Sequence, residues 1–251
     1  MYNRLLNLFI KPSVMIKWIL LLIAGYSFVW SMQLFKAGNA YYSVKNDIEI
    51  WQLYPEKVST QRVNKAINKI NNALIYFPDN ALYYQIQGQL FEWKAIAKMK
   101  EQNLYGENSG AESKVSNLKK AAASYKKSLK LRPKWSGSWV GLASVKLQQG
   151  EFDNEFYTYI ENARKTGPQD AIVHKFIVEF GLKMFNSRSI HYVKTKDLLK
   201  HHLDLGIQNP LSRDFVLKTI KKYEANETVC RWLRDASYPV RKRIPDCISY
   251  D

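Results

Sequence analysis

Residues 114–150 read KVSNLKKAAASYKKSLKLRPKWSGSWVGLASVKLQQG, and this stretch decides the fold. Before Pro133, residues of the type buried in helices stand twelve, eight and five positions upstream, at Ala121, Tyr125 and Ser128. Steps of four and three residues follow one face of an α-helix. Because proline lacks an N–H and disfavours the helical conformation of the residue before it, the helix ends there. A second apolar stretch follows, so the sequence predicts a helical hairpin.

The same arrangement recurs around three further prolines. A helix whose apolar stripe contains alanine, followed by a proline turn and another helix, is one unit of a helix-hairpin solenoid. Such arrays bind partners along extended surfaces. We therefore expect an all-α solenoid over residues 59–226. The matching residues are Ala66, Ile70, Ala73 and Tyr84 around Pro78; Phe156, Ile160, Ala163 and His174 around Pro168; and Leu198, His202, Leu205 and Val216 around Pro210.

The periodicity also sets the expected helix boundaries. Thr60 is expected to cap the first helix, because its hydroxyl can accept from a free N–H at a helix start. The composition of residues 106–113, GENSGAES, predicts an exposed loop. Residues 227–251 are expected to form a terminal cap. Helices are expected over residues 61–76, 81–102, 114–131, 136–148, 153–166, 170–186, 193–206 and 212–224.

One uncharged apolar segment lies near the N-terminus, residues 18–35 (WILLLIAGYSFVWSMQLF), between Lys17 and Lys36. At about 1.5 Å per residue this helix measures about 27 Å, close to the hydrocarbon thickness of a bilayer. Because it is apolar on all sides, it predicts a membrane-spanning helix. A cleaved signal peptide is the alternative, although the segment is longer than a usual signal core. With a retained anchor, residues 1–17 form a cytoplasmic stub and residues 36–58 an amphipathic connector.

The charges beside this segment predict its orientation. Three basic residues and no acidic one precede it, whereas acidic residues soon offset the basic ones that follow. By the positive-inside rule the N-terminus stays in the cytoplasm and the helical domain crosses the membrane. We expect a single-pass protein of a bacterial inner membrane with a periplasmic C-terminal domain. The preceding basic residues are Arg4, Lys11 and Lys17.

The chain has two cysteines, Cys230 and Cys247, both in the C-terminal tail. In an exported domain they are compatible with a disulfide that closes a loop of about 18 residues and contributes about 3 kcal/mol in the chain-entropy model. A zinc site would need more ligands than the tail supplies. A redox pair is disfavoured because the C-x-x-C spacing is absent. The sequence therefore favours a structural bridge.

The formal net charge of +16 at pH 7 favours acidic partners: phospholipid headgroups, anionic polysaccharide or nucleic acid. The alternative is that the bases are dispersed over solvated helix faces, since the lysines occur mostly singly or in pairs. No catalytic, nucleotide-binding or metal-binding motif occurs. His201 and His202 point about 100° apart on a helix and cannot chelate together, and His191 could pair with His174 only through the tertiary fold. We expect no enzymatic activity and no cofactor.

Two basic clusters and four aromatic residues are the candidate binding residues. Arginine forks bind carboxylates and phosphates, and the flat rings of Trp232 and Tyr238 can stack on sugars. Solvated basic surfaces and buried core aromatics are the simpler interpretations. The C-terminal cluster is Arg231, Arg234, Arg241, Lys242 and Arg243. The second is Lys119, Lys120, Lys126, Lys127, Lys130, Arg132 and Lys134. The aromatic candidates for a peptide-binding groove are Tyr84, Phe91, Trp135 and Trp139.

These patterns resemble tetratricopeptide repeats. The family motif places a small, a large and another small residue before a proline, and the next helix begins with a large aromatic followed by Leu-Gly or Leu-Ala. The resemblance covers residues 60–225 and is strongest over 114–168; the last unit departs from it at His202 and Leu205. The matches are Ala66, Ile70, Ala73 and Pro78; Ala121, Tyr125 and Pro133, with Ser128 in place of the second alanine; Trp139, Leu142 and Ala143; and Tyr84 with Gly88.

The overall layout of stub, spanning helix and exported basic domain also resembles VpsP-type proteins, which are accessory proteins of bacterial exopolysaccharide biosynthesis. This resemblance implies a scaffold that holds protein partners of an envelope polysaccharide assembly. The second hypothesis is direct binding of an anionic glycan or another polyanion through the basic surface. A nucleic-acid role comes third, since the export signal does not require it.

Overall fold

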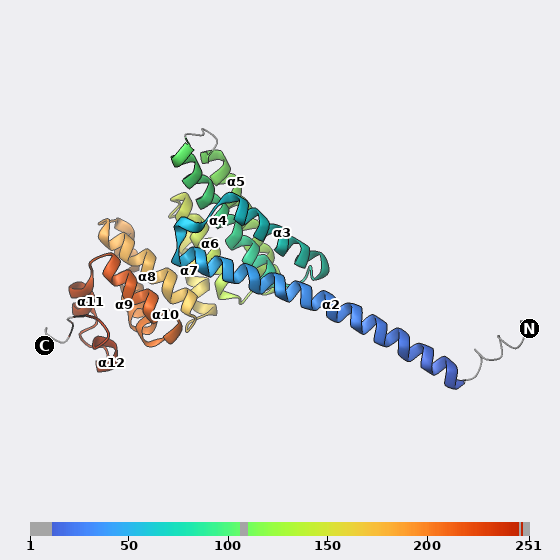
Figure 1. Cartoon of the computed structure of the whole chain (residues 1–251). Helices are drawn as coiled ribbons and strands as arrows, with labels where there is room; N and C mark the ends of the chain where they lie inside the picture. The colour runs from blue at the N-terminus through green and yellow to red at the C-terminus, as the bar shows by residue number, and fades with distance from the viewer. Residues whose placement is uncertain (1–11, 106–109, 246, 248–251) are drawn as a thin grey trace, which may run out of the picture.

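The structure, a computed structural model, describes residues 12–105, 110–245 and 247 of the 251-residue chain. Within these residues all regular elements are helices (Figure 1), which confirms the predicted all-α class. The structure does not describe residues 1–11 of the predicted cytoplasmic stub, residues 106–109 of the predicted loop at 106–113, or residues 246 and 248–251 of the tail.

The first helix, α2 (Pro12–Leu53), has 42 residues and extends from the helical body as a single rod (Figure 1). Its N-terminal part exposes large apolar side chains such as Leu22 and Phe28, which are 73% and 68% exposed. Among the described residues it alone is long and apolar enough to cross a membrane, and none of its apolar window is buried. The predicted connector is not separate from the predicted span, because one helix covers both until Leu53.

The C-terminal part of α2 belongs to the helical body. Ala37, Val44, Ile48 and Trp51 are each at most 4% exposed, and their spacings of seven, four and three residues define one helix face. This face packs against α3 (Thr60–Tyr76) and α4 (Ala81–Tyr105). A 3₁₀ turn, η1 (Pro55–Lys57), follows α2, and the proline ring fixes the backbone where the helix stops.

The later helices repeat one packing scheme. From α2 to α11 each helix contacts the next one in the chain, and α2, α4, α6, α8 and α10 also contact one another in succession. Local stacking of this kind is typical of repeat-like helical arrays. The remaining helices are α5 (Gly110–Leu131), α6 (Ser136–Gln149), α7 (Asn154–Thr166), α8 (Ala171–Asn186), α9 (Ile190–Gln208), α10 (Pro210–Lys222), α11 (Asn226–Trp232) and α12 (Tyr238–Arg241).

The predicted prolines and apolar stripes lie where the periodicity put them. Pro78, Pro133 and Pro168 stand in turns between helices, and Pro210 is the first residue of α10. Tyr125, with Ala121 and Ser128 on the same stripe, is almost fully buried between the helices that flank α5. Three contiguous cores follow the stack, over α2–α4, α4–α8 and α8–α12.

The helices α3 and α5 begin at other residues than predicted. Ser59, not Thr60, caps α3, and its hydroxyl accepts from the N–H of Arg62 at 3.4 Å. Thr60 is already helical, and its N–H and hydroxyl donate to the carboxylate of Glu101 on α4. The helix α5 begins at Gly110, so residues 110–113, predicted as loop, are helical.

Candidate functional site

A groove of about 240 Å³ lies on the face where α2, α4, α6 and α8 meet. Because these helices contact one another in succession, each of them contributes side chains to the same surface. The rim carries amides from three helices, the walls are aromatic and aliphatic, and the base is polar. The rim residues are Gln52, Gln89 and Gln148; the walls include Trp93, Ile96, Val140, Ile172 and Phe176; the base is formed by Glu92, Tyr125 and Ser144.

Glu92 of α4 is a buried carboxyl at the base of this groove, and it accepts hydrogen bonds from two neighbouring helices. The hydroxyl of Tyr125 donates to Oε1, and the hydroxyl of Ser144 donates to Oε2 at 2.5 Å. The side-chain amide of Gln148 also donates to Oε2. Burial raises the pKa of Glu92 to about 7, and the three hydrogen bonds oppose this rise. Near neutral pH the group therefore exists in both protonation states.

Two glycines allow the ring of Tyr125 to reach this carboxyl. The ring passes between α4 and α6, where Gly88 and Gly141 face it. A Cβ atom at Gly88 would lie 2.7 Å from the ring, and one at Gly141 would be closer still. Such distances are far below van der Waals contact, so both positions require glycine for the ring to sit here. The small residues of the repeat pattern thus position the polar base of the groove.

The groove combines apolar walls with a few polar groups. Ligand sites combine apolar walls with a small number of oriented polar groups. The amides of Gln52, Gln89 and Gln148 can both donate and accept. Within the described residues no salt bridge reaches Glu92, so the ionised carboxylate keeps acceptor capacity for a donor on a ligand.

Two of the aromatic residues predicted for the groove lie outside it. Phe91 packs against two core clusters, those of α2–α4 and α4–α8. Tyr84 is half-buried, and the ammonium group of Lys127 lies 5.4 Å from its ring centroid. Neither residue is among those that line the groove.

The other two, Trp135 and Trp139, hold the turn between α5 and α6. The indole N–H of Trp135 donates to the side chain of Gln85, and that of Trp139 donates to the carbonyl of Pro133 at 2.9 Å. The groove instead takes its aromatic walls from Trp93 and Phe176. One feature of the sequence indicates the groove. Glu92 follows Tyr84 and Gly88 by eight and four residues, so an acidic residue stands on the helix face that is otherwise expected to be buried.

The predicted C-terminal basic cluster is mostly exposed. Arg231, Arg234, Lys242 and Arg243 are exposed, whereas Arg241 is half-buried. Arg231 lies 3.9 Å from Glu227 and Arg234 lies 3.5 Å from Asp235, so acidic neighbours offset part of the charge.

Trp232, expected beside this cluster, closes the end of the helix stack. Its ring stacks on Tyr192 with centroids 6.0 Å apart and meets Phe185 edge-on at 5.0 Å. A ring packed in this way is half-buried and offers less of its face to a sugar than an exposed one. Tyr238 is 57% exposed, with the ammonium group of Lys242 5.9 Å from its ring centroid.

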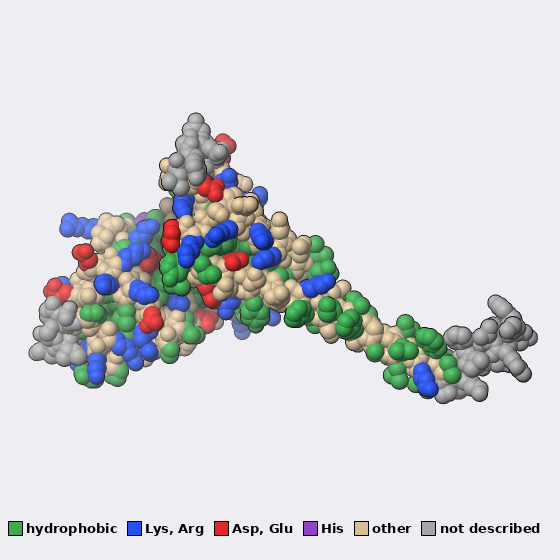
Figure 2. All heavy atoms as spheres, in the orientation of Figure 1, with side chains coloured by type: hydrophobic (Ala, Val, Ile, Leu, Met, Phe, Trp, Pro, Cys, Tyr) green, Lys and Arg blue, Asp and Glu red, His purple; other side chains and the backbone are tan. Residues whose placement is uncertain are grey.

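The second basic cluster follows the outer face of α5. Lys119, Lys126, Lys127 and Lys130 are exposed there, and Lys134 is exposed in the turn that follows. Among the described residues no carboxylate forms a salt bridge with any of these five lysines. Figure 2 shows basic side chains scattered over the visible face rather than gathered into one block.

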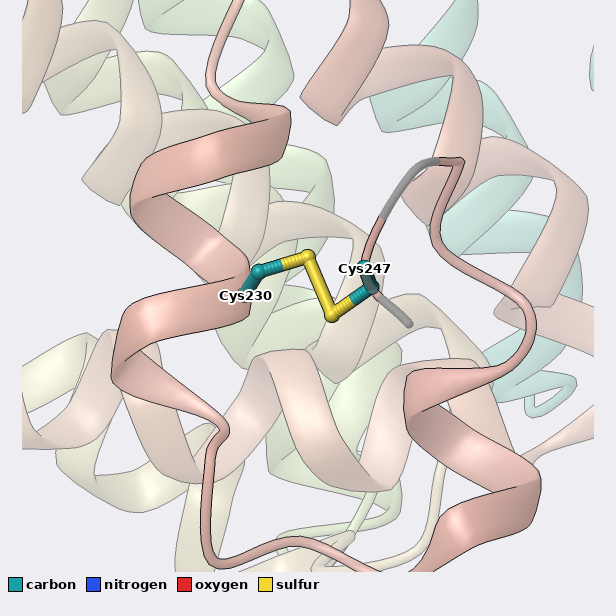
Figure 3. Close-up of a disulfide and its surroundings, with 2 residues drawn as sticks. All are labelled: Cys230 and Cys247. Carbon is teal, nitrogen blue, oxygen red and sulfur yellow. A yellow bond between two sulfur atoms is a disulfide. The ribbon is translucent and has the colours of Figure 1, made fainter. Parts of the chain in front are cut away.

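Cys230 of α11 and Cys247 lie at disulfide distance, with their Cα atoms 5.4 Å apart (Figure 3). The bridge ties the end of the chain to α11 across a sequence separation of 17 residues. Both cysteines are buried with Leu233, Val240 and Ile244 in the last core cluster. The bridge therefore belongs to the terminal cap and lies away from the groove.

Two buried histidines from neighbouring helices form a pair in the core, and His191 is not part of it. His174 of α8 meets His202 of α9, with their Nδ1 atoms 2.8 Å apart, whereas His191 bonds to the hydroxyl of Tyr157. Both His174 and His202 are fully buried, and neither Nε2 atom has a hydrogen-bond partner among the described residues. Burial, followed by the neighbouring His174 and His201, lowers the pKa of His202 to about 3. The pair is therefore neutral inside the core.

No protein-family model matches this chain, and no curated protein matches it.

Proposed function

We propose that the protein is a single-pass membrane scaffold. Its helical domain, of tetratricopeptide type, binds a segment of a partner protein in the groove around Glu92. The observation that carries the proposal is the continuity of α2: the helix that exposes Leu22 and Phe28 also buries Val44 and Ile48 in the body. A rigid helix without a linker holds the groove at a fixed distance and direction from the bilayer. Fixed placement is what a scaffold beside membrane enzymes or channels requires.

The tetratricopeptide assignment is supported by three features together. Prolines end every second helix, small residues stand where helices cross, and each helix packs on its sequence neighbour. The helices that follow the proline turns, α4, α6 and α8, line the groove together with α2. A peptide bound there would run across several units.

The orientation that we propose puts the groove outside the cytoplasm, in the periplasm of a bacterial cell. Arg4, Lys11 and Lys17 precede the span without an acid to offset them. The paired Cys230 and Cys247 suit an oxidising compartment. Together with the layout that resembles VpsP-type proteins, these features favour a partner in envelope polysaccharide assembly.

Site-specific photocrosslinking tests the groove directly. A photoreactive amino acid at Gln89 or Gln148, on the groove rim, is expected to capture one or more envelope proteins in intact cells. The same group at Glu112, exposed at the start of α5 and away from the groove, serves as the matched control. Equal capture at rim and control positions would contradict a peptide-binding groove. Crosslinks made only to cytosolic proteins would contradict the orientation.

Direct binding of an anionic glycan is the second candidate. It is favoured by the lysine face of α5, where Lys119, Lys126 and Lys130 have no salt-bridge partner among the described residues. Electrostatic binding to such a surface falls steeply as salt is added, whereas a partner held in an apolar groove is retained. A Lys119→Gln/Lys126→Gln/Lys130→Gln variant that loses polysaccharide binding while it keeps its protein crosslinks would assign the two activities to different surfaces.

A further inference from the structure

A second groove, of about 430 Å³, lies between α2 and α3 at the point where the exposed rod enters the helical body. Lys36 and Ala40 of α2 form one wall, and Lys69, Asn72 and Tyr76 of α3 form the other. No carboxylate lines this groove. Its polar atoms are therefore mostly hydrogen-bond donors, which is the composition that suits an anion.

The two lysines are placed differently. Lys36 is exposed, is the first charged residue after the apolar segment, and has no salt bridge among the described residues. Lys69 is half-buried, and its ammonium group donates to the hydroxyl of Ser43 on α2 at 2.8 Å. This bond ties Lys69 to α2, and both lysines line the same groove. An ammonium ion has three donors, and Lys69 can therefore bind an anion while it keeps the bond to Ser43.

In a bilayer spanned by α2, the groove would lie at the level of the membrane surface. The ring of Phe77, at the end of α3, meets the ring of Trp30 edge-on with centroids 5.6 Å apart. Trp30 precedes Lys36 by six residues, which is about 9 Å along a helix. Because Trp30 lies near the exit end of the apolar segment, where tryptophan favours the interfacial layer, the turn after α3 lies in that layer.

Exposed side chains around the turn agree with this depth. Ile75 is 74% exposed and Tyr76 is 43% exposed, and Met32, four residues before Lys36 on the same face of α2, is 42% exposed. A bilayer would cover all three apolar side chains, which are otherwise exposed to water. Asp79 is exposed in the same turn. Because a carboxylate is costly in hydrocarbon, the turn reaches the headgroup layer and goes no deeper.

We propose that this groove binds the phosphate headgroup of an anionic glycerophospholipid in the membrane that α2 spans. The phosphate lies between Lys36 and Lys69, and Asn72 and Tyr76 supply further donors. The acyl chains descend along the exposed apolar face of α2 below Lys36, which includes Met32 and Val29. The inference rests on the membrane anchorage proposed above. A lipid fits better than a free anion because exposed apolar side chains continue below the basic groove, where only a lipid has matching chains.

Native mass spectrometry of the full-length protein tests the site. Membranes are first washed with alkaline carbonate, and the protein is then extracted in mild detergent and supplied with phosphatidylglycerol or phosphatidylcholine of equal chain length. The test variant is Lys36→Gln/Lys69→Gln. Lys196→Gln/Lys218→Gln, which changes two exposed lysines of α9 and α10, removes the same charge elsewhere. Lys36→Arg/Lys69→Arg keeps the charge within the groove.

We expect the wild type, the distant control and the arginine variant to retain phosphatidylglycerol in preference to phosphatidylcholine. Each basic residue at a membrane surface strengthens the binding of an anionic lipid about fivefold. Loss of both lysines should therefore lower the retention of phosphatidylglycerol by the glutamine variant about 10- to 30-fold. Added inorganic phosphate should not displace the lipid. Equal retention by the glutamine variant and the distant control, or full displacement by inorganic phosphate, would overturn the lipid site.

The carbonate wash separates this inference from the anchorage. Protein that stays in the pellet but shows no preference for phosphatidylglycerol refutes the lipid site and leaves the anchorage intact. Wild-type protein released into the supernatant refutes the anchorage and the lipid site together.

Discussion

The hydroxyl of Tyr125 on α5 donates to the buried carboxyl of Glu92 on α4, and Ser144 of α6 donates to the other oxygen of the same carboxyl. Three consecutive helices therefore meet at one acid. The contact joins the repeat-like packing to the groove, because the ring that fills the space between α4 and α6 also carries the hydroxyl at the base of the groove. A change at this point should affect stability and binding together.

Replacing Glu92 with glutamine should flatten part of the pH dependence of stability. The pKa of Glu92 is raised from its ordinary value of 4.5 to about 7 in the folded chain. The protonated acid thus favours folding, so its contribution is complete below about pH 4.5 and is lost as the pH rises through about 7, by up to about 3 kcal/mol. Thermal unfolding of wild type and Glu92→Gln across this range measures the difference. Glu112→Gln, an exposed acid on α5, is the control, and parallel curves for wild type and Glu92→Gln would exclude the raised pKa.

Adding a methyl group at Gly141 should destabilise the fold through Tyr125. Overpacking of this kind costs about 1–3 kcal/mol of unfolding free energy. Combining Gly141→Ala with Tyr125→Leu should remove much of the penalty, because the smaller side chain makes room for the methyl group. Gly38→Ala on α2, where no atom lies within 4 Å of the added carbon, should be neutral or stabilising. Additive losses in the double variant, measured by denaturant unfolding, would show that the ring is not the cause.

The helices could be predicted because their signals are local. Proline at Pro78, Pro133 and Pro168 stops a helix without regard to tertiary contacts, and the buried face of α5 repeats at helical spacing through Ala121 and Tyr125. The C-terminal part of α2 was interpreted as a connector, although Val44, Ile48 and Trp51 already show helical spacing. Its role in the core depends on α3 and α4, which only the tertiary fold supplies.

The groove could not be predicted from the sequence, because its side chains come together only in the tertiary fold. Ser144 and Gln148 reach Glu92 across sequence separations of 52 and 56 residues. Periodicity identifies which face of a helix is buried, but not which side chain of another helix meets it. The aromatic candidates Trp135 and Trp139 were chosen for their residue type alone. They bind instead to groups near the α5–α6 turn, because an indole N–H needs a partner when its ring is partly buried.

The buried histidine pair should make the wild-type protein sensitive to acid. The pKa of His202 is lowered to about 3, and that of His174 is also lowered, from an ordinary value of 6.5. The unfolded chain therefore binds more protons below about pH 6.5, and stability falls as the pH drops from there toward 3. A His174→Leu/His202→Leu variant should lose the part of this slope that the histidines contribute, because it removes both titrating groups. Replacing both partners by apolar groups also leaves no unpaired polar atom. Urea unfolding between these pH values measures it. His201→Asn, at an exposed neighbouring position, should keep the wild-type slope, and a double variant that keeps it too would count against the pair.

Breaking the Cys230–Cys247 bridge should loosen the terminal cap. Cys230→Ser/Cys247→Ser should lower the unfolding free energy by about 3 kcal/mol in the chain-entropy model. Amide hydrogen exchange should rise first in α11 and α12, because these short helices pack on little besides the last core cluster. Peptide mass mapping of exported protein without reductant should find the two cysteines joined. Two free thiols in that protein, or unchanged exchange in the serine variant, would remove the structural role of the bridge.

A reporter fused after the last residue should reveal the orientation of α2. By the positive-inside rule we expect Arg4, Lys11 and Lys17 to keep the N-terminus in the cytoplasm, so alkaline phosphatase at the C-terminus should reach the oxidising side and be active. A fluorescent reporter that folds only in the cytoplasm should be dark at the same place. Changing the three basic residues to glutamate should lower phosphatase activity, because the charge difference across the span is then reversed. An inactive phosphatase fusion beside a bright cytoplasmic reporter would place the groove and the disulfide on the wrong side of the membrane for the proposed scaffold.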